Sequence, residues 1–499
     1  RDKMTNDIDI LRGNRLSKTS DLASSFISST DEDLLILDPV KKINIAHMLM
    51  LVKQNILDKK TANKCIKTLK SIDDSFELDP GLEDVHMNVE SFVINRIGSE
   101  TGGQLNLAKS RNDQVATAIR MTTRTFILSI LTSIHDLQKV LLNLAKTHTD
   151  YLMPSFTHLQ HAQIITLSHN LLAHYDSLSR DVDRFQETYD RVNKSPQGSG
   201  AIASVIIHVD RDYIAKLLGF NGIVENSIDA TTTRDFCIEL LSNLTLLMLN
   251  IEKIVNELVL WSTSEFSYVE ISDEFSSTSS IMPQKKNPVI AELIRSKSSI
   301  IIGDLVASIG IIKSLTLGYS IDIQDLTPRL WNSINKSLSS VQLLSNMLNT
   351  CKFNKESMYA NLDDTMIAAD LANYLASNYN ISFRQSHHIV GTLSKSSIDS
   401  NTKLSELVKT DIDKITKKIT GKTIKINVSE IDSIFNYANN VNSKTTNGSP
   451  SNSESNRMIK LRTVQLSNSS KFIKKQQNLL TKSEILLEKS IRNLSGGGN

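Results

Sequence analysis

Apolar residues in the middle of the chain recur at alternating steps of four and three, which is the spacing of one face of an amphipathic helix. One such seam begins at Leu171 and ends at Val192, and another begins at Leu240 and ends at Trp261. Each seam predicts a helix of about six turns. The two seams consist of Leu171, Tyr175, Leu178, Val182, Phe185, Tyr189 and Val192, and of Leu240, Leu244, Leu247, Ile251, Ile254, Leu258 and Trp261.

The second seam has a parallel apolar stripe beside it, so its apolar face is wider than one neighbouring helix requires. The stripe consists of Leu241, Met248 and Val255. Residues 130–144 and 294–315 carry two further seams. These patterns predict an all-α protein whose centre, residues 111–358, is an elongated multi-helix bundle. Helices with several apolar faces have more surface than one chain covers, so we expect burial against other copies of the chain.

The regions on either side of the bundle have shorter patterns. Residues 1–110 mix short helical segments with glycines, and residues 359–499 return to short amphipathic pieces. We therefore expect a smaller N-terminal domain and a smaller C-terminal helical domain. Residues 439–456 are rich in Asn, Ser, Thr and Gly and predict a loop, and the final SGGGN is interpreted as a tail outside the fold.

Charge and cysteine content narrow the possible functions. The chain has 499 residues and a formal net charge of +2, which provides no basic field for nucleic acid or a membrane surface and favours a small-molecule ligand. The three cysteines have spacings that fit neither disulfides nor a zinc site, which favours the cytoplasm. The N-terminus lacks the apolar core of a signal peptide. The most apolar segment, residues 299–317, contains two charges and is shorter than the roughly 20 residues of a membrane span.

A polar loop at residues 276–288, SSTSSIMPQKKNP, separates two of these helical patterns. Pro283 and Pro288 withhold backbone donors and prevent the loop from continuing a helix. The loop presents a hydroxyl, an ammonium and an amide, which suit an anionic ligand, on Ser279, Lys285 and Asn287. A simple polar connection is the alternative, but the order of these residues argues against it.

Residues 110–114, SRNDQ, precede the first long helical pattern. The Arg111 guanidinium can bind a carboxylate through two hydrogen bonds, and helix N-termini favour anions. The alternative is a solvated helix cap made by Asp113 and Gln114, and the segment by itself does not decide between the two.

Residues 154–163 contain Thr157 and His158, and an imidazole can transfer a proton near neutral pH. A lone histidine is more often a structural hydrogen-bonding group. Glu292 lies five residues after Asn287, where it could orient an imidazole or interact with a helix dipole.

Two further segments could be either functional or simple connections. Gly198-Ser-Gly200 indicates a tight turn. The proline-broken stretch 319–329 combines Tyr319, Gln324 and Arg329.

Taken in order, these segments resemble the fumarase/aspartase superfamily, and within it the argininosuccinate lyase family, over nearly the whole chain. SSIMPQKKNP (279–288) is similar to the superfamily signature, and SRNDQ and FTHLQHAQ (156–163) are similar to two other family segments. Four more segments follow the same pattern: LRGNRLS (11–17), SPQGSGAIAS (195–204), ENSIDATTTRDF (225–236) and ADLANYL (369–375).

The resemblance implies a carbon–nitrogen lyase of arginine biosynthesis that reversibly cleaves argininosuccinate to L-arginine and fumarate. It implies no metal and no organic cofactor. It also implies a homotetramer in which the central helices form one common bundle and each active site takes segments from three subunits.

Carried over residue by residue, the resemblance makes Ser279 the base that removes the Cβ proton. Lys285 and Asn287 would stabilise the resulting aci-carboxylate. His158, oriented by Glu292, would supply a proton to the leaving guanidino nitrogen. The implied carboxylate-binding residues are Ser29, Arg111, Asn112 and Thr157, and those for the arginine portion are Tyr319 and Gln324.

The chain departs from the family pattern at three places. Asn106 replaces a histidine, and Thr278 replaces a glycine before the serine pair. A lysine often found after the Gln324 position is missing, which leaves Arg329 as its candidate substitute.

Two other functions are alternatives for this sequence. The first is another fumarate-releasing lyase, such as one acting on adenylosuccinate, but the sequence has no Gly-rich phosphate loop. The second is a catalytically silent, crystallin-like relative, which loss of Ser279 or His158 would favour; both residues are present.

Overall fold

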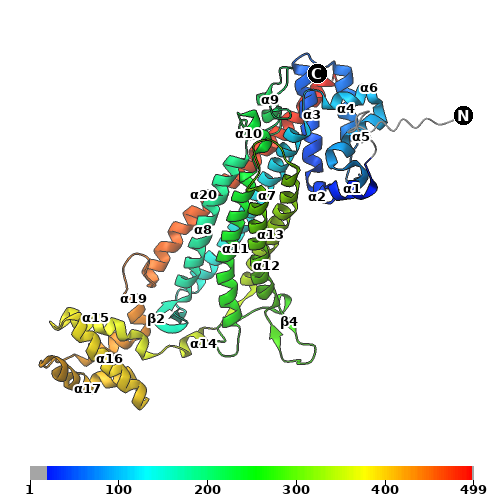
Figure 1. The fold of residues 1–499 in the computed structure, drawn as a ribbon. Coiled ribbons are helices and arrows are strands. Elements are labelled where there is room, and N and C mark those ends of the chain that lie inside the picture. The colour runs from blue at the N-terminus through cyan, green and yellow to red at the C-terminus, as the bar shows by residue number, and fades with distance from the viewer. Residues whose placement is uncertain (1–18, 497–499) are drawn as a thin grey trace.

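The computed structural model describes residues 19–496, and the segment LRGNRLS at 11–17 lies outside them. The described chain is an elongated bundle of long helices with smaller helical regions at its two ends (Figure 1). The predicted all-α fold is confirmed, since the strands are short and form three separate two-stranded pairs within the described residues.

Five long helices form the bundle and run alternately toward and away from the N-terminal domain (Figure 1). They are α7 (Arg111–Thr147), α8 (Leu167–Val192), α11 (Asp235–Trp261), α12 (Val289–Ile312) and α13 (Leu326–Thr350). Between them lie β1 (Leu152–Thr157), β2 (Gln160–Thr166), α9 (Arg211–Leu217), α10 (Ser227–Thr232), β3 (Val269–Glu270), η4 (Asp273–Phe275), β4 (Ser277–Thr278), β5 (Lys286–Asn287) and η5 (Ile321–Asp325).

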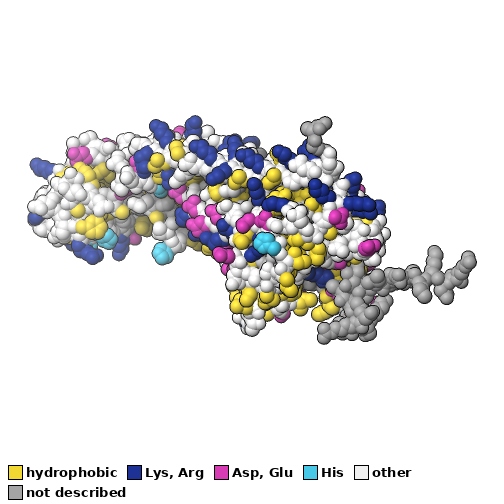
Figure 2. All heavy atoms as spheres, turned by 90° about the horizontal axis from the view of Figure 1, so that it is seen from above, with side chains coloured by type: hydrophobic (Ala, Val, Ile, Leu, Met, Phe, Trp, Pro, Cys, Tyr) yellow, Lys and Arg dark blue, Asp and Glu magenta, His cyan; other side chains and the backbone are white. Residues whose placement is uncertain are grey.

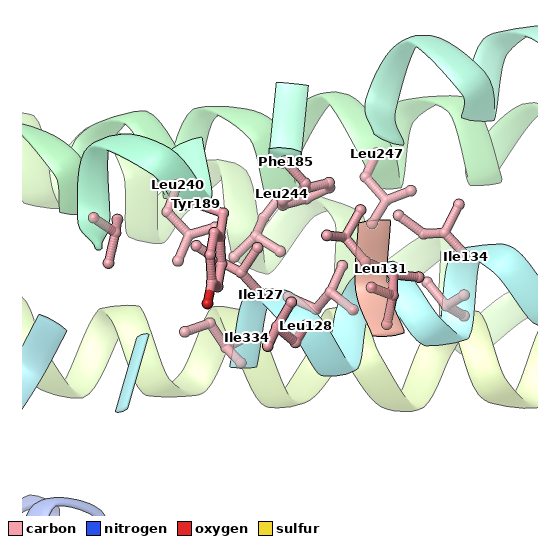
Figure 3. Close-up of a cluster of buried hydrophobic side chains, with 14 of the residues drawn as sticks. Ile127, Leu128, Leu131, Ile134, Phe185, Tyr189, Leu240, Leu244, Leu247 and Ile334 are labelled. Atoms are coloured by element: carbon pink, nitrogen blue, oxygen red, sulfur yellow. The ribbon is translucent and has the colours of Figure 1, made fainter. Parts of the chain in front are cut away.

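The predicted seams form the core of the bundle. Every residue of the two seams in α8 and α11 is buried. Figure 3 shows Phe185 and Leu244 packed near Leu131 of α7, with Ile334 of α13 close by. The seams in α7 and α12 are also confirmed as helical, and burial of these aliphatic and aromatic side chains is the main force holding the helices together.

Buried arginines add a second kind of contact between the helices. Arg120 of α7 donates to the carbonyl oxygen of Arg191, at the end of α8, over 3.0 Å. Arg124, one turn further on, donates to the carbonyl oxygen of Leu218, after α9. The two guanidinium groups lie 4.1 and 4.4 Å from phenylalanine ring centroids. Each guanidinium therefore donates to carbonyl groups that have no partner within their helix, and its positive charge interacts favourably with the partial negative charge of that helix C-terminus.

The two end regions consist of short elements. The N-terminal domain contains α1 (Asp21–Ile27), α2 (Thr30–Asp33), η1 (Leu34–Ile36), α3 (Leu37–Lys53), α4 (Lys59–Lys70), η2 (Pro80–Leu82), α5 (Val85–Ile97), α6 (Ser99–Gly102) and η3 (Gly103–Asn106). The other end contains β6 (Lys352–Phe353), α14 (Lys355–Ala360), η6 (Asp364–Ile367), α15 (Ala368–Asn378), α16 (Phe383–Ser400), α17 (Leu404–Thr420), α18 (Val428–Phe435) and α19 (Tyr437–Asn442).

The last helix differs from the prediction of short pieces after residue 358. α20 (Asn452–Leu494) is 43 residues long and returns along α7 and α8 to the N-terminal domain (Figure 1). Its apolar seam is narrow, with one apolar residue every seven positions, and Ser or Gln occupies several of the other buried positions, so the seam is weaker than those of α8 and α11. The repeating residues are Ile459, Leu466, Ile473, Leu480, Leu487 and Leu494. The predicted loop at 439–456 is correspondingly shorter, because α19 ends at Asn442 and α20 begins at Asn452.

Helix α7 is long and apolar enough to cross a membrane by length and composition, but 56% of its most apolar window is buried inside the molecule. That burial is typical of a core helix, and it agrees with the packing of α7 against α8, α13 and α20.

The surface of the bundle carries exposed apolar side chains. Seen from above, Lys and Arg line one long edge of the molecule and hydrophobic side chains gather on the opposite side (Figure 2). Helix α12 alone exposes Leu293, Ile300, Ile302, Val306 and Ile309. Such a run of exposed residues on one helix is typical of an interface.

Close packing at Gly219 predicts how firmly α20 is held. Gly219 follows α9 with φ +73°, and an added Cβ would lie 3.0 Å from the Ser483 Cβ and even closer to its Oγ. We expect Gly219→Ala to destabilise the docking of α20 by about 1–3 kcal/mol, which hydrogen exchange of α20 amides would measure. Gly421→Ala is the matched control, because Gly421 has the same φ and open space around it. Equal exchange of α20 in the two variants would contradict the prediction.

Candidate active site

Two adjoining cavities lie where the N-terminal domain meets the bundle. Their volumes are about 160 and 420 Å³. Arg111, Tyr319 and Gln324 line both, Ser29 lines the smaller one, and Asn112 lines the larger one. The structure therefore brings together five of the residues that the sequence nominated for substrate binding.

Arg111 projects from the first turn of α7. Its Nε lies 3.1 Å from an Asp84 carboxylate oxygen, and about a third of the side chain stays exposed. The capping alternative holds in part, because Ser110 Oγ accepts the Asn112 backbone N–H while Asp113 accepts the Ser110 N–H. The cap is buried and not solvated, and Gln114 donates to Asn44 instead of capping the helix. The segment thus serves as a helix cap and as a cavity wall at once.

Asp113 also fixes the Gly198-Ser-Gly200 turn. Its Oδ2 accepts the backbone N–H groups of Gly198 and Gly200 over 3.1 and 2.9 Å. Both glycines have positive φ, which a residue with a Cβ adopts only with strain. Burial raises the pKa of Asp113 to about 7. This turn is therefore an anchor at the start of α7, and next to it the Asn112 amide donates to the Ala201 carbonyl oxygen over 3.0 Å.

The smaller cavity contains acidic groups that the sequence reasoning missed. Ser29 Oγ donates to Asp33 over 2.9 Å, the Val85 N–H donates to the same oxygen, and burial raises the pKa of Asp33 to about 6. Gln324 Nε2 donates to the Ile27 carbonyl oxygen over 2.7 Å. These bonds tie the short segment before α2 to α5 and η5, which are far away in the sequence.

The wall shared by the two cavities contains His86, also missed from the sequence. Burial lowers the pKa of His86 to about 4, and neither ring nitrogen has a hydrogen-bond partner among residues 19–496. Asn106 lines the larger cavity beside Lys109, whose pKa burial lowers to about 7. The first departure from the family pattern therefore puts a neutral amide in the cavity wall.

The loop that carries Ser279 projects from the opposite end of the bundle, at β4 in Figure 1. β4 and β5 pair antiparallel, with Ser277 opposite Asn287 and Thr278 opposite Lys286. Thr278 lies in this extended strand and not in the left-handed region, so its Cβ fits where the family has glycine.

Ser279 is held at the start of the loop tip. Its Oγ accepts the backbone N–H groups of Ile281 and Met282 over 3.3 and 3.1 Å. Two donors aimed at one oxygen favour negative charge on that oxygen.

The two lysines of the loop have different surroundings. Lys286 lies 2.7 Å from Asp273 and 3.5 Å from Glu270, and the hydrogen bond to Asp273 raises its pKa. Lys285 is exposed and forms no ion pair within the described chain. Lys286 therefore anchors the loop base, and Lys285 stays available to a ligand.

Thr157 and His158 lie at the tip of a hairpin, which the sequence did not suggest. β1 and β2 pair with Thr157 opposite Gln160, and His158 and Leu159 form the turn with φ 55° and 57°. Two positive φ values match the preferred two-residue hairpin turn but strain residues other than glycine, asparagine and aspartate. The strained tip is exposed, with Leu159 81% accessible.

Within one chain the nominated residues form separate groups. The 37 residues of α7 span about 55 Å, so Arg111 and the hairpin cannot touch one small molecule. The 24 residues of α12 likewise separate Glu292 from Tyr319 by more than about 30 Å. Glu292 is exposed, and no hydrogen bond joins it to His158 in residues 19–496.

Arg329 lies apart from both cavities in the single chain. It is in the first turn of α13 with Nη1 3.7 Å from Asp304 of α12, and it lines neither cavity. Its role as a substitute for the missing lysine stays a prediction.

The described chain has the all-α fold of fumarase/aspartase superfamily lyases. The fold is similar to a crystal structure of EDDS lyase in complex with formate, with a TM-score of 0.87, 25% identity and 96% of each chain covered. A lyase family model matches residues 17–303, and an argininosuccinate lyase C-terminal model matches residues 365–442.

Two curated relatives are argininosuccinate lyases from archaea. The one from Methanothrix thermoacetophila is 36% identical over 490 residues, covering 98% of each chain. The one from Nitrosopumilus maritimus is 40% identical over 476 residues, covering 95% of this chain and 97% of the relative. The chain belongs to the argininosuccinate lyase family.

The anchoring role of Asp113 is testable. We expect Asp113→Ala to destabilise the fold by about 1–3 kcal/mol for each amide left without a partner and to speed hydrogen exchange at Gly198 and Gly200. Asp58→Ala serves as the control, because Asp58 is the exposed N-cap of α4 and accepts only the Thr61 N–H. Its removal should lower the free energy of unfolding by about 1 kcal/mol. Unchanged exchange at the two glycines would show that Asp113 does not hold the turn.

Proposed function

We propose that this protein reversibly cleaves argininosuccinate to L-arginine and fumarate. The Cβ–H and C–N bonds of the succinyl portion break, a carbon–carbon double bond forms, and the guanidino nitrogen leaves with a proton. Membership of the family supports the reaction, and the pair of N–H groups on Ser279 Oγ is the observation that carries the mechanism.

Ser279 acts as the base that removes the Cβ proton. A serine hydroxyl is a weak base unless its alkoxide is stabilised, and the N–H groups of Ile281 and Met282 supply that stabilisation. Since these donors belong to the backbone of a loop fixed by β4 and β5, no reorganisation is needed when charge develops.

Lys285 and Asn287 stabilise the aci-carboxylate formed when the proton leaves. The Lys285 ammonium has no carboxylate partner in the part of the chain that the structure describes, so its charge is not already neutralised. Charge supplied where it develops lowers the barrier more than charge that binds the ground state equally well.

His158 supplies the proton to the leaving nitrogen, with Glu292 orienting its ring. These two residues come from different copies, because no contact joins them within one chain. The exposed hairpin tip suits this role, since it can reach into a neighbouring subunit.

The working form is a homotetramer with composite sites. The exposed apolar residues of α12 can be buried against another copy. Assembly is needed because the polar groups of one chain lie too far apart to contact a single substrate. Arg111, Asn112, Ser29 and Thr157 then bind the carboxylates of the succinyl portion, while Tyr319 and Gln324 hold the arginine portion.

The reaction needs only proton transfer and charge stabilisation, so we propose that it proceeds without a metal or organic cofactor. The cysteines Cys65, Cys237 and Cys351 are free, and we propose a cytoplasmic location. The rival substrate is adenylosuccinate: release of fumarate from adenylosuccinate but not from argininosuccinate would overturn the proposed substrate.

Ser279→Ala and His158→Asn should each lower kcat by about 10²–10⁴, since each removes one proton-transfer group. Fumarate absorbance would follow turnover, and light scattering would show that the assembly persists. Ser280→Ala removes the neighbouring hydroxyl and should retain most activity. Near-normal turnover in either of the first two variants would refute its assigned role.

Sites shared between copies predict complementation. Ser279→Ala and Arg111→Met should each inactivate the protein when alone, because every site then lacks one required group. The two residues lie at opposite ends of the bundle, so a shared site takes them from different copies. When the two variants are unfolded and refolded together, some sites receive both intact residues, so activity should return. No recovery, while wild-type protein refolded in the same way regains activity, would argue against composite sites.

A further inference from the structure

Arg234 is a buried guanidinium that uses only part of its hydrogen-bonding capacity. It lies immediately before α11 and is 4% exposed. Its Nη1 donates to the carbonyl oxygens of Thr231 and Thr233, over 3.4 and 2.8 Å, at the end of α10. Its Nε and Nη2 have no hydrogen-bond partner among residues 19–496.

The surroundings of Arg234 connect it to the smaller cavity. Arg234 lines that cavity together with Arg111 and Tyr319. The charges of Arg234, Arg111, Asp84 and Asp33 all act on the Tyr319 hydroxyl, whose pKa burial raises. These groups therefore surround one small space.

The charge of Arg234 is not balanced by any carboxylate in the described chain. Arg111, in contrast, has Asp84 within 3.1 Å. A buried cation without a counter-charge is costly, and its cost falls when an anion binds. The two free donors, Nε and Nη2, form the edge of a guanidinium that binds both oxygens of one carboxylate.

The lining of the cavity indicates which carboxylate would fit. Glu32, Asp33 and Asp325 line it as well, so a dicarboxylate such as fumarate would meet negative groups. An α-amino acid head group carries an ammonium beside its carboxylate and matches both kinds of charge. The succinyl carboxylates are assigned to Arg111 and Asn112 in the adjoining larger cavity, facing Ser279 and Lys285 of another copy.

We propose that Arg234 binds the α-carboxylate of the arginine portion of the substrate and so selects an amino acid over an amine. This assignment rests on the proposed function. It completes the subsite of Tyr319 and Gln324, which line the same cavity. The guanidino group of the ligand then extends away from Arg234 toward the reacting end.

The test compares L-arginine with agmatine, which is arginine without the α-carboxylate. Calorimetry on the intact assembly would measure binding of both by the wild type and by Arg234→Gln. We expect the variant to bind arginine at least about thirtyfold more weakly and agmatine with less than a threefold change, because truncating one partner of a buried charge pair is strongly unfavourable. Inhibition by fumarate should not change.

Arg120→Gln is the matched control, because Arg120 is also buried, caps a helix C-terminus and has an unpartnered Nε, but does not line the cavity. It should lower the melting temperature without changing the preference for arginine. If Arg234→Gln does not assemble, Arg234→Lys gives the same comparison, because an ammonium keeps the charge but lacks the two parallel N–H donors of a guanidinium. We expect this variant to bind arginine at least about tenfold more weakly and agmatine without change.

Retention of the arginine preference in Arg234→Gln or Arg234→Lys would overturn the assignment. Loss of the preference in Arg120→Gln as well would also overturn it. Cleavage of argininosuccinate by the wild type is measured separately, so a failure of the proposed reaction is distinguishable from a failure at Arg234. A wild type that binds arginine and agmatine equally would contradict the role of Arg234 even if the protein is an active lyase.

Discussion

The fixed length of the long helices is the constraint on which the rest of the structure depends. An α-helix rises about 1.5 Å per residue and cannot shorten without breaking its hydrogen bonds, so α7 holds its two ends about 55 Å apart. The buried seams of α8 and α11, which are 26 and 27 residues long, hold the bundle together along much of that length. The nominated polar groups therefore lie at the two ends of the bundle, and a substrate-sized molecule meets only one end of a given chain.

Several buried charged side chains form hydrogen bonds with backbone groups at helix ends. Arg120, Arg124 and Arg234 each donate to carbonyl oxygens at the end of a helix. Asp113 binds N–H groups at the start of α7 and in the adjacent turn. Each contact places an ionisable side chain against backbone groups that lack a partner within a helix, which fixes the loops near the cavities. The same loops carry several of the groups that face the cavities.

The sequence predicted the bundle because apolar seams are local and periodic, and it nominated five of the cavity residues through their motifs. It did not predict α20, whose apolar seam is only one residue in seven and is interrupted by buried Ser and Gln. It did not indicate the hairpin, because His158 and Leu159 lack the Asn-Gly signal of such turns. Asp33, Asp84 and His86 were missed because they come from two short elements, α2 and α5, that no motif connects.

The division of polar groups between the two ends of the bundle links chemistry to mass action. A chain whose carboxylate-binding cavities and proton-transfer loop lie too far apart to share a ligand gains nothing from folding alone. In the proposed composite site, output depends on how often copies meet and stay together, so the fraction of working sites falls as the protein is diluted below the dissociation constant of the assembly. For such a protein, the concentration in the cell sets the activity of each chain as well as the number of chains.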